Sequence, residues 1–170
     1  MRNERMKKRI LSLLSIAAFC ILMSGSVVNA EASDQELKIV DGSYLTTDDS
    51  STGYSHSTVT RGEYLMTGES TISKAGLTRV YAYASTTANQ TVDYMATIAY
   101  VERYLEEEDA WGYVYGWAEE VENDYYMSIA DSVKVDRGYY YRVRARHIAG
   151  DYDAYPYDET ASVTNGILLP

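Results

Sequence analysis

From residue 58 to the C-terminus, apolar and polar side chains alternate with a period of two, a pattern typical of strands rather than helices. Clusters of Gly, Asn and Asp interrupt the pattern at predicted turns, among them Thr67-Gly68 and 88–90, and the whole chain has only two prolines. The sequence therefore predicts an all-β fold, an antiparallel β-sandwich, with a small closed β-barrel as the alternative. The predicted strands are 58–66, 70–74, 78–86, 92–105, 111–121, 125–130, 138–148 and 160–164.

The N-terminus has the pattern of a secretory signal peptide. Basic residues crowd the first nine positions, residues 10–23 are uncharged, and small residues precede Ala30. We expect residues 1–30 to be removed after Ala30, with Ala32 as the neighbouring cleavage site. The uncharged run is shorter than the roughly 20 residues that span a bilayer, so no stable membrane span is expected after cleavage. The protein is predicted to be secreted and extracellular.

The composition of the mature chain excludes several classes of function. Its single cysteine, Cys20, lies in the signal peptide, so neither disulfides nor thiol chemistry are expected. The full chain has a net charge of −10, and removal of the basic N-terminus makes it more acidic. Such a chain is repelled by phosphate backbones, so nucleic-acid binding is not expected. An exported domain without cysteine is typical of a Gram-positive bacterium.

The domain is predicted to begin well after the signal peptide. Residues 43–57 are nearly all Ser, Thr, Asp and Gly, and such a stretch buries too little apolar surface to offset its ordering entropy. We therefore expect a flexible leader over residues 31–57 and one β-sandwich domain over residues 58–170.

The segment around Gly138 contains the most specific local pattern. Gly138 is followed three residues later by Tyr141, and then by alternating apolar residues. The pattern resembles a strand corner of fibronectin type III and immunoglobulin-like domains, which implies that the hydroxyl of Tyr141 bonds to backbone a few residues upstream. Tyr140 fits the immunoglobulin spacing, but Arg142 stands where that family has cysteine. On the opposite face to Tyr141, strand alternation places Tyr140, Arg142, Arg144 and Arg146.

The order of segments along the whole chain also resembles a known group. A signal peptide, a Ser/Thr-rich leader and a tyrosine-rich β domain occur in this order in a family of small secreted Firmicutes proteins of unknown function. The resemblance implies export and supplies no activity.

One segment offers a candidate ligand surface. Alternation places Trp111, Tyr113, Tyr115 and Trp117 on one strand face. These aromatics either fill the core or form an exposed platform of the kind that stacks on sugar rings, and the core is the favoured interpretation. On the preceding strand, the residues predicted to extend this surface are Tyr100, Glu102 and Tyr104.

Motifs for catalysis and metal binding are missing from the sequence. The two histidines, His56 and His147, stand in no zinc or nucleophile pattern. Asp151 and Asp153 lack the remaining ligands of a calcium loop, so the carboxylate clusters are expected to be solvated charge. We expect no enzyme activity, catalytic residue, cofactor or metal.

These observations predict an exported, non-enzymatic binding or interaction module. Its expected partner is an extracellular polymer, a glycan or a protein. Two alternatives from other classes stay open, a small secreted hydrolase and a structural or toxin-type protein that acts by self-association.

Overall fold

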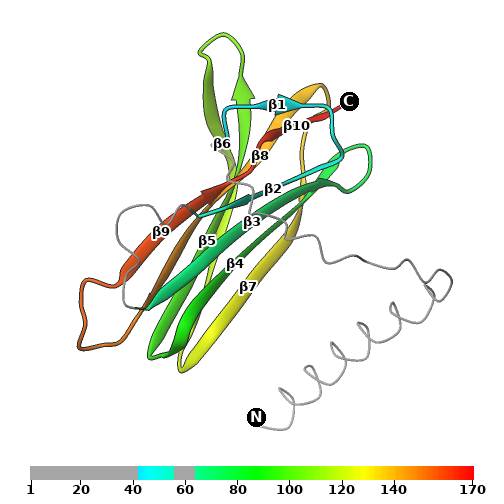
Figure 1. Cartoon of the computed structure of the whole chain (residues 1–170). Coiled ribbons are helices and arrows are strands. Elements are labelled where there is room, and N and C mark those ends of the chain that lie inside the picture. Colours follow the sequence, from blue (N-terminus) through cyan, green and yellow to red (C-terminus); the bar gives the residue numbers. More distant parts are fainter. Residues whose placement is uncertain (1–41, 56–63) are drawn as a thin grey trace, which may run out of the picture. The chain divides into compact units, whose positions relative to one another are not determined.

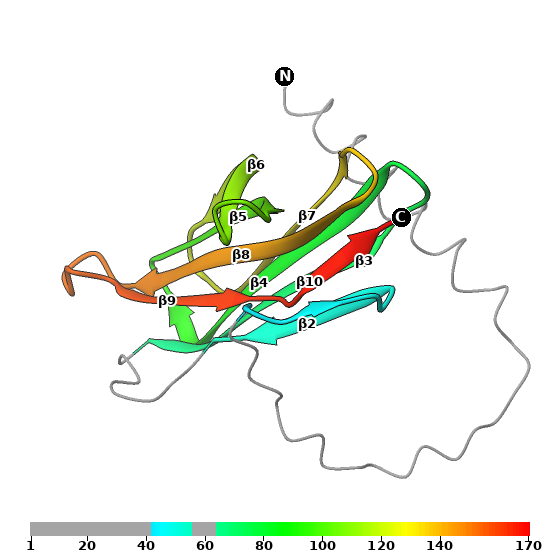
Figure 2. The same ribbon diagram turned by 90° about the horizontal axis from the view of Figure 1, so that it is seen from above.

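The computed structural model describes residues 42–55 and 64–170, which form strands in two sheets packed face to face (Figures 1 and 2). One sheet, sheet A, has the order β1-β10-β8-β5-β6, with β9 also paired to β8, and the other, sheet B, has the order β2-β3-β4-β7. Sheet A consists of β1 (Leu45–Thr46), β5 (Tyr94–Leu105), β6 (Ala110–Val121), β8 (Tyr139–Gly150), β9 (Asp158–Val163) and β10 (Gly166–Leu169). Sheet B consists of β2 (Ser50–Tyr54), β3 (Leu65–Lys74), β4 (Arg79–Val92) and β7 (Asp124–Lys134).

Neither sheet closes into a barrel, so the predicted β-sandwich is confirmed. Among the described residues, all strand pairs are antiparallel except β1 with β10, which is parallel. The tip of the β5–β6 hairpin projects beyond the rest of the sandwich (Figure 1).

The register of β5 with β8 determines which side chains of sheet A enter the core. The two strands pair from Tyr94↔Gly150 to Arg103↔Tyr141 without a shift. Side chains that face each other across this pair point to the same side, and alternate pairs point to opposite sides. Ala99 and Ala145 face inward, whereas Tyr100 and Arg144 face outward.

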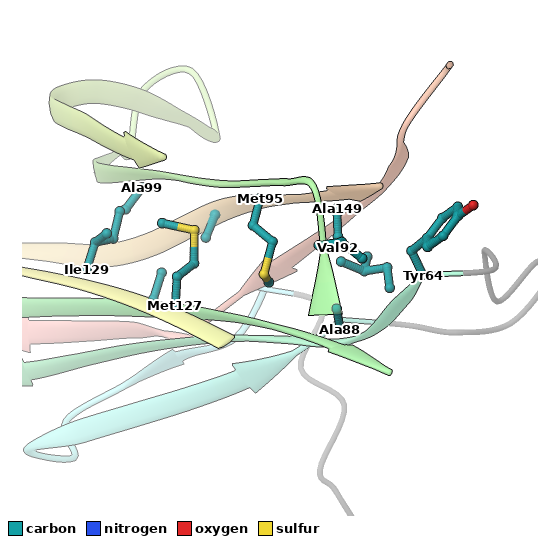
Figure 3. Close-up of a cluster of buried hydrophobic side chains, with 11 residues drawn as sticks. Tyr64, Ala88, Val92, Met95, Ala99, Met127, Ile129 and Ala149 are labelled. Atoms are coloured by element: carbon teal, nitrogen blue, oxygen red, sulfur yellow. The ribbon is translucent and has the colours of Figure 1, made fainter. Parts of the chain in front are cut away.

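Two hydrophobic clusters fill the space between the sheets. Small side chains such as Ala84, Ala99 and Ala145 let the sheets approach closely. Figure 3 shows much of the first cluster, which contains Tyr64, Leu65, Ala84, Ala88, Val92, Met95, Ala99, Met127, Ile129, Ala145 and Ala149. The second cluster contains Ile72, Val80, Ala82, Val101, Val133, Val135, Tyr141, Val143, Ile167 and Leu169.

A buried polar network also links the sheets. His147 of β8 is fully buried; its Nδ1 lies 3.0 Å from Thr86 Oγ1 on β4, and its Nε2 lies 2.7 Å from Ser162 Oγ on β9. Thr86 in turn bonds Thr97 of β5 at 2.6 Å. Gly68 of β3 makes room for the ring, because a Cβ there would lie 2.2 Å from His147 Cδ2. Burial lowers the pKa of His147 to about 4, so the ring is neutral.

Tyr141 makes the backbone bond that was predicted for it. The ring is buried in the second cluster, and the hydroxyl donates to the carbonyl of Asp136 at 2.8 Å. Gly138, between these two residues, has a φ of +85°, a left-handed conformation that glycine adopts without steric penalty. The bond therefore holds the turn into β8 against the strand itself.

The predicted leader does not extend to residue 57. Strands β1 and β2 both lie within its range, and β2 pairs with β3 from Ser50↔Ser73 to Tyr54↔Glu69. The Ser and Thr side chains of β2 bury little apolar area, but backbone pairing with β3 and contacts such as Thr52 Oγ1 to Thr71 Oγ1 at 2.8 Å hold the strand. Local composition could not show that a partner strand was available.

Two predicted turns are strand interior, and a third strand was missed besides β1 and β2. The turn predicted at Thr67-Gly68 lies within β3, where the glycine serves the packing of His147. The turn predicted at 88–90 lies within β4, which continues to Val92. Strand β10 was not predicted; it pairs with β8 and buries Ile167 and Leu169. The first predicted strand, 58–66, falls mostly outside the described residues.

We predict that Tyr141→Phe lowers the free energy of unfolding by about 1 kcal/mol, because it removes the hydroxyl and leaves the carbonyl of Asp136 without that bond. Tyr140→Phe is the matched control, since Tyr140 lies on the outer side of the same strand. Chemical denaturation of both variants is the measurement. Loss of stability in the control alone would contradict the assignment.

We predict that His147 makes the fold less stable as the pH falls from about 6.5 to about 4. The folded pKa lies below the unfolded value, so the unfolded chain binds the extra proton in this window. The full effect is roughly 3 kcal/mol. The measurement is the free energy of unfolding of wild type and of His147→Asn from pH 7.5 to 4. Within the window, unfolding of the wild type should take up one more proton than unfolding of the variant, so its free energy of unfolding should fall more steeply as the pH is lowered. An NMR titration midpoint of His147 near 6.5 would contradict this.

Candidate functional site

An extra residue in β6 divides the four aromatics of the candidate surface between two faces. Tyr115 pairs with Val101 of β5, and Tyr113 pairs with the next residue, Glu102, so Val114 is left without a partner. Such a bulge reverses the alternation of side chains along the strand. The prediction that all four aromatics share one face is therefore wrong: Trp117 and Tyr115 face inward, and Trp111 and Tyr113 face outward.

The inward pair lies at the edge of the core, where Trp117 is partly buried and Tyr115 is 38% exposed. Trp117 packs against both hydrophobic clusters. The ring of Tyr115 stacks on Trp117 with centroids 5.6 Å apart, and its hydroxyl donates to Asp131 of β7 at 3.1 Å. This hydrogen bond raises the pKa of Tyr115. Together the two side chains cover the side of the sandwich between β6 and β7.

The outward pair joins two tyrosines of β5. The centroids of Trp111 and Tyr104 lie 5.3 Å apart, and those of Tyr113 and Tyr100 lie 6.5 Å apart in an edge contact. Tyr113 is 69% exposed. The predicted extension of the surface by Tyr100 and Tyr104 is therefore present, although only for half of the β6 aromatics.

Two arginines of β8 lie on these rings. The guanidinium carbon of Arg142 is 4.3 Å from the ring centre of Trp111, and that of Arg144 is 4.5 Å from the ring centre of Tyr100. Both distances are typical of cation–π contacts, which are favourable by about 0.5–1 kcal/mol near a surface. The arginines thus help to hold both rings in place.

Glu102 binds both arginines at the centre of this face. Its Oε2 accepts from Arg142 Nε and its Oε1 from Arg144 Nε, each at 2.8 Å. The Glu102 side chain is almost buried, and Arg142 also donates Nη1 to the carbonyl of Gly42 at 2.9 Å. Burial lowers the pKa of Arg142 while Glu102 raises it, and an arginine stays protonated in either case.

Arg146 continues the row toward β9. Its Nε donates to Glu159 at 2.7 Å, and this bond lowers the pKa of Glu159 and raises that of Arg146. Both side chains are about half exposed. We call the whole surface the outer aromatic face, and it consists of Tyr100, Glu102, Tyr104, Trp111, Tyr113, Arg142, Arg144, Arg146 and Glu159.

Close approach of the backbone is required at two points of the face. A Cβ at Gly166 of β10 would lie 2.5 Å from Trp111 Cη2, so the indole reaches across the sheet only because residue 166 is glycine. A Cβ at Gly116 would lie 3.0 Å from Tyr100 Cδ1 and 3.2 Å from Tyr113 Cε2. The two glycines leave space for the rings.

The pair Ser162 and His147 has the distance of a nucleophile and its base, but it does not form an accessible site. Ser162 is 2% exposed and His147 is fully buried, so neither meets a solvent-borne substrate in this conformation. Sequence reasoning missed this contact because the two residues lie on different strands without a shared motif. The other histidine, His56, lies outside the described residues, as does the cleavage site at Ala30.

The acidic loops use their carboxylates to cap backbone. Asp151 accepts from the backbone N–H of Asp93, and Asp93 accepts from that of Tyr152. Tyr152 also donates to Glu122 at 2.8 Å, which raises its pKa to about 12. Within residues 42–55 and 64–170, no group of three or more His, Cys, Asp or Glu side chains is arranged to hold a metal ion.

Comparison with family models and with curated proteins finds no match for this chain. Among the residues that the structure describes, no helix has the length and apolar character to cross a membrane.

We predict that Trp117→Ala destabilises the fold by about 3 kcal/mol, because it removes a ring that both clusters contact and leaves a cavity. Trp117→Phe is the control, since the indole Nε1 is buried and makes no hydrogen bond within the described part of the chain. Phenylalanine keeps most of the ring contact. Urea denaturation should show a large loss for alanine and a much smaller one for phenylalanine, whereas equal losses would contradict the packing role.

Proposed function

We propose that this protein is an exported, non-enzymatic binding module and that the outer aromatic face is its ligand surface. The observation that carries the proposal is the outward position of Tyr113 and Trp111 in contact with Tyr100 and Tyr104. Aromatic rings that face solvent offer flat apolar area to a ligand, and they are enriched at recognition surfaces.

The rigidity of the face supports binding. Arg144 is held by Glu102 and lies on Tyr100, and Arg142 is held by Glu102 and lies on Trp111. Side chains that are already ordered lose little conformational entropy when a ligand arrives. A surface of this kind gains more affinity per contact than one made of mobile side chains.

Self-association through β6 is the less favoured alternative. Strand β6 lies at an edge of sheet A, where an unpaired strand can add to a second copy. The bulge at Val114 and the exposed acids Glu119 and Glu120 both oppose such pairing. We therefore propose that the outward aromatic residues of β6 bind a ligand other than a second copy of this chain.

The test is binding of the purified protein to an array of glycans and cell-wall polymers, compared between two tyrosine variants. Tyr113→Ala should weaken binding at least about tenfold, because an exposed aromatic anchor is lost. Tyr125→Ala is the matched control, since Tyr125 lies on β7 of the other sheet and is 59% exposed. Both variants should keep the stability of the wild type within about 0.5 kcal/mol. Equal binding by both variants would refute the proposed surface.

A further inference from the structure

The outer aromatic face has a net charge of only +1, because its three arginines are matched by two glutamates, Glu102 and Glu159. Arg142 and Arg144 are both paired with Glu102, and Arg146 is paired with Glu159. A ligand carboxylate or phosphate would have to compete with these glutamates at distances of 2.7–2.8 Å. The outer aromatic face is therefore expected to bind anionic ligands only weakly.

The charge of the whole chain also opposes an anionic ligand. With a net charge of −10, the chain repels a polyanion at long range. Clefts that recruit polyanions present unpaired basic side chains in a positive field, which this face does not do. Charge thus favours an uncharged ligand at the face.

The face nevertheless contains groups that bind hydroxyls. About 40% of the Arg144 and Arg146 side chains is exposed, and a guanidinium has further N–H donors beyond the Nε that each gives to glutamate. The carboxylate of Glu159 is half exposed and can accept. Donors and acceptors therefore stand beside aromatic rings, which suits a ligand with apolar C–H faces and hydroxyl edges.

The rings are arranged for an elongated ligand. They form two groups, Tyr104 with Trp111 and Tyr100 with Tyr113. Tyr100 and Tyr104 are four residues apart on β5, which corresponds to about 13 Å along the strand. One sugar ring can contact only one of these groups, whereas a chain of linked sugars can contact both.

From these observations we infer that the outer aromatic face binds an uncharged glycan chain of several sugar units. Sugar rings stack on the two aromatic groups, and their hydroxyls bond Arg144, Arg146 and Glu159. The inference rests on the proposed function and adds to it the charge and the length of the ligand.

The experiment is calorimetric titration of the purified protein with neutral hexasaccharides and an acidic one of equal length. The neutral probes are cellohexaose, xylohexaose, mannohexaose and chitohexaose, and the acidic probe is hexagalacturonate. At least one neutral hexasaccharide should bind at least about tenfold more tightly than its own disaccharide, because only the longer chain reaches both ring groups. Its affinity should change less than about twofold between 50 and 500 mM salt, since no ionic contact is lost.

Variants identify the face as the site. Tyr113→Ala and Tyr100→Ala should each weaken binding of the neutral hexasaccharide at least about tenfold, and Tyr125→Ala should leave it unchanged. Arg146→Gln, which keeps a hydroxyl-binding amide, should weaken it much less than Tyr113→Ala.

Two results overturn the inference, and they are distinguishable. In the first result, only hexagalacturonate binds, and both salt and Tyr113→Ala weaken its binding. This result would refute an uncharged ligand but would leave the outer aromatic face as the binding surface. Absence of binding by all five hexasaccharides, together with equal behaviour of Tyr113→Ala and Tyr125→Ala on the polymer array, would refute the inference and the proposed function together.

Discussion

The uninterrupted register between β5 and β8 is the constraint on which the rest of the structure depends. It places Ala99 and Ala145 inside and Tyr100 and Arg144 outside. The same strand pair therefore contributes one side to the core and the other side to the outer aromatic face. Strand β6 follows this register from Val121 only as far as Tyr115. Beyond the bulge its side chains change sides, so the same strand packs Trp117 against the core and places Trp111 on the outer aromatic face.

The tyrosine-rich, acidic composition has a common structural basis. The chain has 18 tyrosines and one phenylalanine, and several tyrosine hydroxyls donate to carboxylates near the surface. Examples are Tyr115 with Asp131, Tyr152 with Glu122 and Tyr104 with Asp109, and each bond raises the pKa of its tyrosine. A thin sandwich has many half-buried positions, where a ring needs both an apolar face and a polar end. Acidic residues supply the partners for these polar ends.

Paired charges on the outer aromatic face and buried polar groups in the interior fix the positions of neighbouring strands. Glu102 holds two arginines in the outer face, and His147 connects β8 with β4 and β9 in the interior. Breaking either network would leave a desolvated polar group unpaired, which is more costly than the net gain of a single hydrogen bond. Each network therefore favours one arrangement of the strands over alternatives with similar hydrophobic contact.

Local sequence determined the all-β class, most strands of the two sheets, and the bond of Tyr141 to Asp136, because alternation and turn residues act over a few positions. It also predicted that Tyr100 and Tyr104 would extend an aromatic surface. Tertiary structure alone decided that Val114 is the extra residue, that Gly68 makes room for His147 rather than forming a turn, and that residues 50–54 pair with β3. These outcomes depend on which strand lies alongside, and no short segment encodes its partner's register.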